Sequence, residues 1–228
     1  MKTQISFKDS TLKIVAVVTM LIDHTGIILN NILPQWAYMI FRGIGRISFP
    51  VFAFFIVSGF LNTGNFWNYF IRMVFFAIVS EVPFDLLTSN SLVNPDANNV
   101  MFTFVIALAV LYTCQWGLKN GKEGKVISVA VIIGGMAAAW YLKTDYSWRG
   151  VLLIVVIYYA WFYRTAMYAL GTIVLWLKGT FLGVFAPLAF IFLHFYDGKH
   201  GKMSKWFFYI FYPAHIIILV IIRRFIYG

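Results

Sequence analysis

The amino-acid sequence predicts an all-α, polytopic transmembrane bundle, and three observations support that fold class. Of the 228 residues, 61% are hydrophobic and only 11% are charged, whereas soluble domains carry about 25% charged residues. The apolar residues form continuous runs rather than alternating patterns, which favours helices over a membrane barrel. Several runs reach the roughly 20 residues that a helix needs to cross a bilayer. We expect one integral-membrane domain over residues 1–228, with the lipid bilayer as its surroundings.

The first predicted span covers residues 12–33 and carries two titratable side chains, Asp23 and His24, near its middle. A basic leader precedes it, but the apolar stretch is too long for a cleaved signal and no small-residue cleavage site follows. We therefore expect a retained span with a cytoplasmic N-terminus. A titratable side chain inside a membrane costs at least a few kcal/mol, so this pair requires partners, a water-filled cavity or a reaction.

Turn signals and helix breakers place the later spans. Pro34 ends the first span, and the segment 62–65 (NTGN) forms a turn after the second. The region 166–196 is expected to contain two helices, because two glycines and a proline within it weaken one long helix. The spans expected after the first are 36–61, 66–87, 99–118, 126–142, 148–162, two within 166–196, and 206–222.

The basic loops distinguish about nine spans from eight. With nine spans, the clusters at 119–125 and 199–205 both lie on the cytoplasmic side, as the positive-inside rule requires. With eight, the cluster at 199–205 would be translocated, although Arg223 and Arg224 would then be inside. We favour nine. This topology and contact with lipid headgroups explain the formal net charge of +10 without a nucleic-acid partner.

Ionisable residues inside the predicted spans lie at matching depths. At about 1.5 Å per helical residue, His24, Arg46 and His215 each lie roughly 14–15 Å from a span end, near the bilayer midplane. Arg42 shares a helix face with Arg46, and Tyr212 shares one with His215, because their spacings are four and three residues. The set within the spans is Asp23, His24, Arg42, Arg46, Arg72, Glu81, Asp85 and His215.

Three interpretations of this set are open. A charge-balanced network of three arginines and three carboxylates would hold the first three spans together without any reaction. An acyl- or group-transferase would use an imidazole as base and cations to hold an anionic donor. A proton-linked transporter would pass protons along Asp23, His24 and His215; an inverted repeat would favour it, and the sequence shows none. No metal site is expected, because four histidines and the single Cys114 show no ligand spacing.

Six motifs follow one another along the chain: LIDHTG (21–26), RGIGRISFPVFAFFIVSGF (42–60), NYFIRMVFFAIVSEVPFDLL (68–87), NVMFTF (99–104), YDGKHG (196–201) and FYIFYPAHIIIL (208–219). In order and spacing they resemble the pattern of the TraX-like family, which is distantly similar to the integral-membrane acyltransferase 3 proteins. The resemblance runs from about Lys13 to the C-terminus and is weakest over 119–180. It implies an enzyme of the bacterial cytoplasmic (inner) membrane that uses acyl-CoA, first of all acetyl-CoA. The founding activity of the family is N-terminal acetylation of a conjugative pilin subunit.

The resemblance also implies roles for individual residues. The catalytic histidine of the wider superfamily lies on the first span and corresponds to His24, which we expect to act as general base. Asp23 either orients His24 or pairs with an arginine, because adjacent helical residues point about 100° apart. Arg46 or His215 is expected to stabilise the oxyanion of the tetrahedral intermediate.

Donor and acceptor are expected to approach from opposite sides of the membrane. Acyl-CoA is cytosolic and carries phosphates, so cationic residues should hold it. The acceptor is a peptide, a glycan or a lipid, and a non-catalytic role in assembly is a further alternative. Residues expected to bind the donor are Arg72, near the cytoplasmic end of its span, Arg42 and Lys199. Residues expected to bind the acceptor are Glu81 and Asp85, towards the outer side, and Tyr212.

Overall fold

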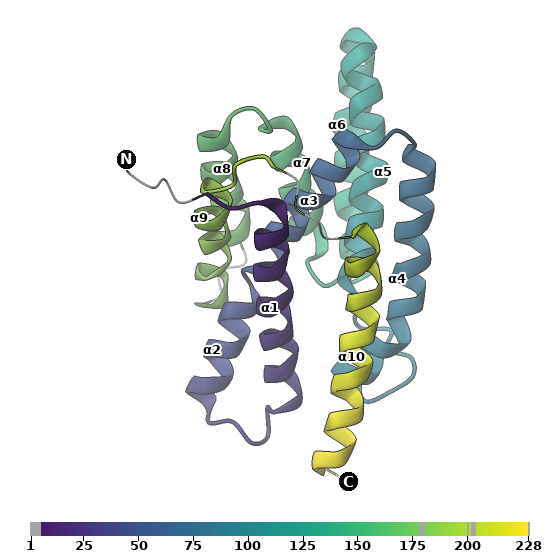
Figure 1. Cartoon of the computed structure of the whole chain (residues 1–228). Coiled ribbons are helices and arrows are strands. Elements are labelled where there is room, and N and C mark those ends of the chain that lie inside the picture. Colours follow the sequence, from purple (N-terminus) through teal and green to yellow (C-terminus); the bar gives the residue numbers. More distant parts are fainter. Residues whose placement is uncertain (1–5, 178–180, 200, 202–203, 228) are drawn as a thin grey trace, which may run out of the picture. The chain divides into compact units, whose positions relative to one another are not determined.

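A computed structural model describes residues 6–177, 181–199, 201 and 204–227 (Figure 1). The described chain consists of helices joined by turns, with two isolated β-bridges, which confirms the predicted all-α class. The elements are α1 (Asp9–Ile28), α2 (Gln35–Gly45), α3 (Ser48–Asn62), α4 (Phe66–Ser89), α5 (Val100–Lys119), α6 (Gly121–Tyr141), α7 (Ser147–Tyr159), α8 (Arg164–Trp176), the 3-10 helices η1 (Phe181–Val184) and η2 (Ala186–Leu188), α9 (Ala189–His194) and α10 (Lys205–Tyr227).

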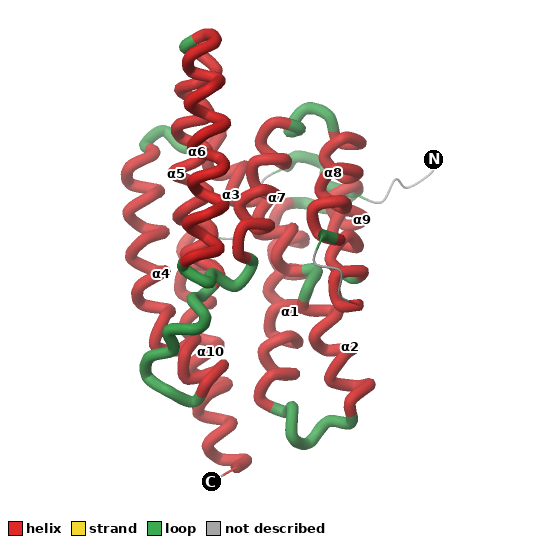
Figure 2. Tube along the Cα trace, turned by 180° about the vertical axis from the view of Figure 1, so that it is seen from behind, coloured by secondary structure: helices red, strands yellow, loops and turns green. Residues whose placement is uncertain are grey.

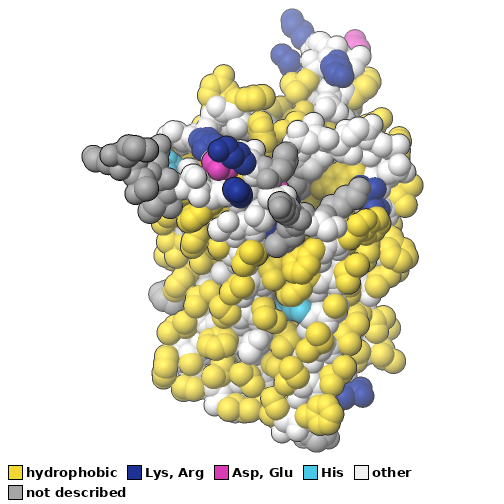
Figure 3. Space-filling view, viewed as in Figure 1, with side chains coloured by type: hydrophobic (Ala, Val, Ile, Leu, Met, Phe, Trp, Pro, Cys, Tyr) yellow, Lys and Arg dark blue, Asp and Glu magenta, His cyan; other side chains and the backbone are white. Residues whose placement is uncertain are grey.

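Five helical stretches are long and apolar enough to cross a membrane. They are α1, the stretch Gln35–Asn62 that contains α2 and α3, α5, α6, and Trp206–Tyr227 within α10. Helix α7 is apolar but shorter. Hydrophobic side chains cover most of the face drawn in Figure 3, as expected for a surface that meets lipid. These features agree with a polytopic membrane protein, and the number of nine spans stays a prediction.

The first helix is displaced towards the N-terminus relative to the predicted span 12–33. It begins at Asp9, whose carboxylate lies in the first turn where the helix dipole favours negative charge. It ends at Ile28, because the residues that follow turn towards Pro34, and Leu29 donates its N–H to the Thr25 carbonyl at 3.0 Å. His24 therefore lies four residues, about 6 Å, from this helix end. The sequence predicted about 14 Å from His24 to the end of the span at Leu33. This distance is wrong for α1, which ends at Ile28.

The second predicted span, 36–61, is two helices rather than one. Helix α2 ends at Gly45 and α3 begins at Ser48, whose hydroxyl donates to the Gly45 carbonyl at 2.7 Å. Pro50 explains the break, because it has no N–H to donate to the carbonyl of Arg46, four residues earlier. Arg46 thus lies at a helix interruption beside α1.

The remaining helices follow the predictions with shifted ends. Helix α4 agrees with the predicted 66–87, and the Asn65 side chain caps it by accepting from the N–H of Asn68 at 3.0 Å. Helix α6 starts at 121 rather than 126, and α10 extends to 227 rather than 222. Two α-helices, α8 and the six-residue α9, occupy 166–196 as predicted. The break expected near Lys178 and Gly179 lies outside the described residues.

The chain divides into two compact units. Unit 1 comprises residues 1–52 and 164–228, and unit 2 comprises residues 53–163. In unit 1, α1 lies beside α2 and contacts α10 (Figure 1). In unit 2, α5 and α6 form a hairpin, and α5 also contacts α4 and α7 (Figure 2). The division concerns compactness alone, so the expectation of a single integral-membrane domain stays a prediction.

Candidate functional site

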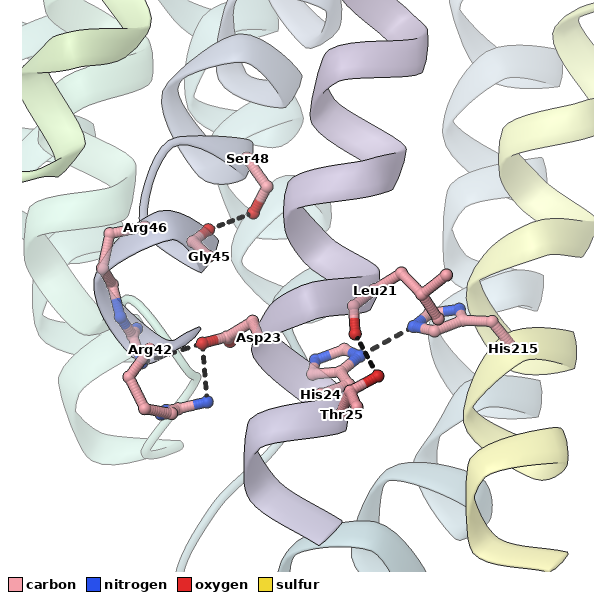
Figure 4. A network of polar contacts seen from close by, with 9 residues as sticks. All are labelled: Leu21, Asp23, His24, Thr25, Arg42, Gly45, Arg46, Ser48 and His215. Carbon is pink, nitrogen blue, oxygen red and sulfur yellow. Dashed lines mark hydrogen bonds and ion pairs between the residues drawn. The ribbon is translucent and has the colours of Figure 1, made fainter. Parts of the chain in front are cut away.

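Unit 1 contains a cluster of three charged residues between α1 and α2, which we call the arginine cluster: Asp23, Arg42 and Arg46. The Asp23 Oδ1 atom lies 2.8 Å from Arg42 Nη1 and 4.0 Å from Arg46 Nη2 (Figure 4). The shorter contact does not have hydrogen-bond geometry, so it is an ion pair. All three side chains are largely buried, with exposed fractions of 10–17%. The two cations and one anion leave a net charge of one positive.

Two glycines allow α1 and α2 to approach closely enough for this cluster. A Cβ atom on Gly45 would overlap the side chain of Asp23. A Cβ atom on Gly26 would lie 2.8 Å from Cβ of Phe41, closer than real Cβ atoms come. Because glycine has a hydrogen atom in place of a side chain, these two positions let α1 and α2 come close enough for the carboxylate of Asp23 to reach the arginines.

A pair of histidines, the histidine pair, joins α1 to α10. Nδ1 of His24 lies 2.7 Å from Nε2 of His215 (Figure 4). Their ring planes differ by 5° and their centroids are 5.0 Å apart, so the two rings lie side by side in nearly one plane. Both residues are buried, with exposed fractions of 7% and 4%. This arrangement aligns the nitrogen lone pair of one ring with the N–H of the other.

The surroundings of His215 fix which nitrogen carries the hydrogen. Its Nδ1 lies 2.7 Å from the carbonyl oxygen of Phe211, and a carbonyl only accepts. Nδ1 of His215 is therefore protonated, and in the neutral ring its Nε2 accepts from Nδ1–H of His24. His24 then keeps the lone pair of its Nε2. Figure 4 shows this second nitrogen of His24 on the side of the ring that faces Asp23 and Arg42.

Tyr212 completes the group around the histidines. Its ring meets that of His24 edge to face, with centroids 6.4 Å apart, and lies 5.8 Å from the ring of His215. The prediction that Tyr212 and His215 share a face of the last helix is confirmed. Tyr212 is buried, so its ring forms part of the wall around the imidazoles.

Lys199 lies at the other end of α1 from the histidine pair. Lys199 belongs to a loop, and its backbone carbonyl accepts a hydrogen bond from the N–H of Asp9, the first residue of α1. From Asp9 to His24 the helix rises by about 22 Å. The exposed side chain of Lys199 is thus placed away from His24, and its expected role in donor binding stays a prediction.

Arg72, Glu81 and Asp85 belong to unit 2, where the two carboxylates hold a loop. One oxygen of Glu81 accepts from the backbone N–H of Asn99 at 3.1 Å, and one oxygen of Asp85 accepts from the N–H of Asn94 at 3.0 Å. These contacts give both residues a structural role. Arg72 is half-buried in α4. Their expected roles in substrate binding stay predictions.

The structure answers the question of which partner Asp23 takes. Asp23 pairs with Arg42 on α2, whereas His24 pairs with His215 on α10. The sequence pointed to all of these residues, and the expectation that Gly45 permits a close helix approach is confirmed, but it missed the carbonyl of Phe211. The four-residue spacing from Phe211 to His215 was a usable signal, because a histidine side chain can reach the carbonyl one turn earlier.

Within the described residues, no group of three or more His, Cys, Asp or Glu side chains is placed to hold a metal ion. The candidate site consists of the arginine cluster and the histidine pair, whose members on α1, Asp23 and His24, are adjacent residues. The arrangement combines a proton-accepting nitrogen with a neighbouring surplus of positive charge.

Comparison with known proteins agrees with the resemblance of the six motifs. A family model described as TraX protein matches residues 8–223. The chain belongs to the TraX protein family. It is also 26% identical over 253 aligned residues to the probable fimbrial assembly protein FimC, serogroup H1, of Dichelobacter nodosus, and the alignment covers 99% of this chain and 100% of that protein. No solved structure shows a significant match. The part matched by the TraX model includes the whole arginine cluster and the histidine pair.

Proposed function

We propose that this TraX-family protein is a membrane acyltransferase. It moves an acyl group, first of all acetyl, from cytosolic acyl-CoA to an amine or hydroxyl of an acceptor within or across the membrane. The observation that supports this most directly is the histidine pair, which leaves Nε2 of His24 as a proton acceptor beside the arginine cluster. The association of the family with pilin acetylation supports the same reaction class.

In the proposed reaction, Nε2 of His24 removes the proton from the acceptor as its nitrogen or oxygen attacks the thioester carbonyl. A carbon–nitrogen or carbon–oxygen bond forms, and the carbonyl oxygen becomes an oxyanion. The intermediate collapses by breaking the carbon–sulfur bond. The CoA thiolate leaves and takes the proton from His24, so the products are the acylated acceptor and CoA with a free thiol.

Two neighbours of His24 support these steps in different ways. His215 acts as a positioning residue, because accepting from Nδ1–H keeps the base nitrogen of His24 directed away from α10. When His24 gains a proton, the same hydrogen bond strengthens, since its donor is then charged. The net positive charge of the arginine cluster favours the developing oxyanion in a site of low dielectric constant.

We propose the N-terminal amine of a pilin or fimbrial subunit as the acceptor to test first. The D. nodosus relative is named a fimbrial assembly protein, and the founding activity of the family is pilin acetylation. Glycan and lipid hydroxyls are the competing acceptors. They are best tested in the same reaction, since the proposed base would serve either nucleophile.

The central experiment measures transfer of labelled acetyl from acetyl-CoA by the purified protein in lipid nanodiscs, with peptide, glycan and lipid acceptors supplied together. His24→Gln should lower the rate roughly 10²- to 10⁴-fold, the usual contribution of a general base. Thr25→Ala is the matched control, because the Thr25 hydroxyl donates only to the Leu21 carbonyl of its own helix, at 2.8 Å. Full transfer by His24→Gln would contradict the proposal.

A second pair of variants tests the positioning role of His215. His215→Ala removes the acceptor for Nδ1–H of His24 and should lower transfer roughly 10- to 100-fold, equivalent to about 1.4–2.7 kcal/mol of barrier. His215→Gln should retain more activity, because its amide oxygen can accept the same hydrogen. Equal losses in the two variants, with both proteins folded, would show that His215 contributes packing only.

A proton-linked transporter is the second candidate function, because hydrogen-bonded histidines can also pass protons. The two functions differ in their products. Release of CoA that depends on His24 supports the enzyme, whereas pH-coupled flux of a substrate in liposomes, without release of CoA, supports the transporter. The same purified protein serves for both measurements.

A further inference from the structure

Unit 1 contains a pocket that is separate from the histidine pair. It has a volume of about 610 Å³ and opens to the outside of the protein along one face of α8, and it is bounded by His194 at the end of α9. The wall is formed by side chains one turn apart on α8, from Arg164 at its start to Ile173. These positions span about 14 Å along the helix axis. The pocket is therefore an elongated groove with a cation at one end.

Tyr168 is the unusual member of the wall. Its ring is held by Phe190 and His194, with centroid distances of 5.3 and 6.3 Å. Its hydroxyl oxygen is buried, yet it has no hydrogen-bond partner among the described residues. A buried hydroxyl without a partner costs about 1–3 kcal/mol, and native proteins rarely tolerate it without a reason. This oxygen is closed to water, so a ligand atom from the pocket would give the hydroxyl its hydrogen bond only after a neighbouring side chain moves aside.

The polar groups around Tyr168 suit an anion. Nη2 of Arg164 donates a hydrogen bond to the backbone carbonyl of Tyr196 at 3.2 Å, and this bond holds the guanidinium at the rim of the pocket. The wall also contains His194 and the hydroxyls of Thr165 and Thr172, and no carboxylate is among the described residues that form it. Arginine and hydroxyl donors together match the several acceptor oxygens of a phosphate group.

The place of the pocket in the fold agrees with this chemistry. Arg164 bonds to the loop that contains Lys199, so the cationic end of the groove lies at the same end of unit 1 as Lys199, the first residue of the basic segment 199–205. Positive-inside counting places that segment on the cytoplasmic side. Alanine and isoleucine side chains continue the wall along α8 towards Ile173. The groove thus offers donors for a phosphate and an apolar surface for the hydrocarbon attached to it.

We propose that this pocket binds the phosphate of an organic phosphate compound, with Arg164, Tyr168 and His194 as its anion-binding groups. Two sources share that chemistry: the phosphates of a CoA thioester at the cytoplasmic side, and the phosphodiester headgroup of an anionic phospholipid. Only the first source rests on the proposed acyltransferase function.

The test uses the full-length protein in nanodiscs made from zwitterionic phosphatidylcholine. One measurement titrates CoA by calorimetry. The other adds phosphatidylglycerol and counts, by native mass spectrometry, the molecules of it that stay bound to the protein. Arg164→Gln should weaken binding roughly 10- to 100-fold, because it removes a charge-assisted contact. Tyr168→Phe should weaken it about 2- to 10-fold while keeping the ring contacts with Phe190 and His194. Lys122→Gln, an equal loss of charge in the exposed start of α6, is the control and should change neither measurement.

Each outcome decides the proposal. Weaker CoA binding in both pocket variants supports it with the donor as ligand, and loss of phosphatidylglycerol alone supports it with the lipid as ligand. Binding that is absent in the wild type, or unchanged in Tyr168→Phe and in folded Arg164→Gln, overturns it. His24→Gln should bind CoA normally, so failure of acyl transfer and failure of the pocket give different results.

Discussion

The two compact units use their polar side chains in different ways. In unit 2, the carboxylates of Glu81 and Asp85 accept backbone N–H groups of a loop, at 3.1 and 3.0 Å. In the candidate site of unit 1, the titratable side chains meet one another across helices, as in the 2.7 Å contact between His24 and His215. Backbone partners make a carboxylate part of the scaffold. A contact between two side chains that leaves a basic nitrogen available is what the proposed proton transfer requires.

The largest expected effect separates the two kinds of carboxylate. Asp23→Asn leaves two buried arginines without their counter-charge and should lower the free energy of unfolding by about 3–5 kcal/mol. Asp85→Asn should cost only about 0.5–1.5 kcal/mol, because the amide oxygen can still accept from Asn94. Both are measured by denaturant titration in micelles with tryptophan fluorescence. Equal losses would remove the distinction between the units.

A double variant sharpens this comparison. In Asp23→Asn with Arg42→Gln, the removed anion is matched by a removed cation. The loss of stability should therefore be smaller than the sum of the two single losses. Additive losses would mean that Asp23 and Arg42 do not stabilise each other.

A smaller effect is expected from the glycine that lets α1 and α2 approach. Gly45→Ala places a methyl group where the Asp23 side chain lies and should cost about 1–3 kcal/mol of stability. Gly134→Ala is the control from unit 2, because its Cβ would meet nothing within 4 Å. In that exposed helical position alanine should stabilise the protein by about 0.5–1 kcal/mol. The same measurement of unfolding compares them, and a neutral Gly45→Ala would contradict the close approach.

A similarly small effect is expected for an uncharged contact in unit 2. The hydroxyls of Thr103 and Thr144 lie 2.9 Å apart in the core. Thr103→Val should lower the free energy of unfolding by about 1 kcal/mol, and the acetyl-transfer rate per folded molecule should stay that of the wild type. The loss is small because Thr144 can still donate to the carbonyl of Ala139. A large fall in that rate would show that unit 2 contributes more than structure.

Hydropathy and charge were sufficient to predict the helical class and to select the polar residues of the site. They could not predict the pairings. Whether Asp23 turns towards His24 or Arg42 depends on the rotation of α1 and on its distance from α2. That distance is set by hydrogen atoms at Gly26 and Gly45, and hydropathy does not describe it.

The helix ends show the same limit. Leu29, Ile32 and Leu33 are apolar, so a span judged by average hydropathy continues past Asn30 and Asn31, although α1 ends at Ile28. The break before Ser48 could have been found, because Pro50 leaves the carbonyl of Arg46 without its usual donor. The association of α10 with α1 could not, since no local pattern links residues that lie at opposite ends of the chain.

The contact between the first and last long helices has a consequence for synthesis of the protein. His24 and His215 are 191 residues apart. At the usual 5–20 residues per second, roughly 10–40 s pass between their translation. During that interval α1 is complete, but the partner of its imidazole does not yet exist. Every chain truncated before His215 lacks the hydrogen-bond partner of His24, so the histidine pair forms only in chains synthesised through α10.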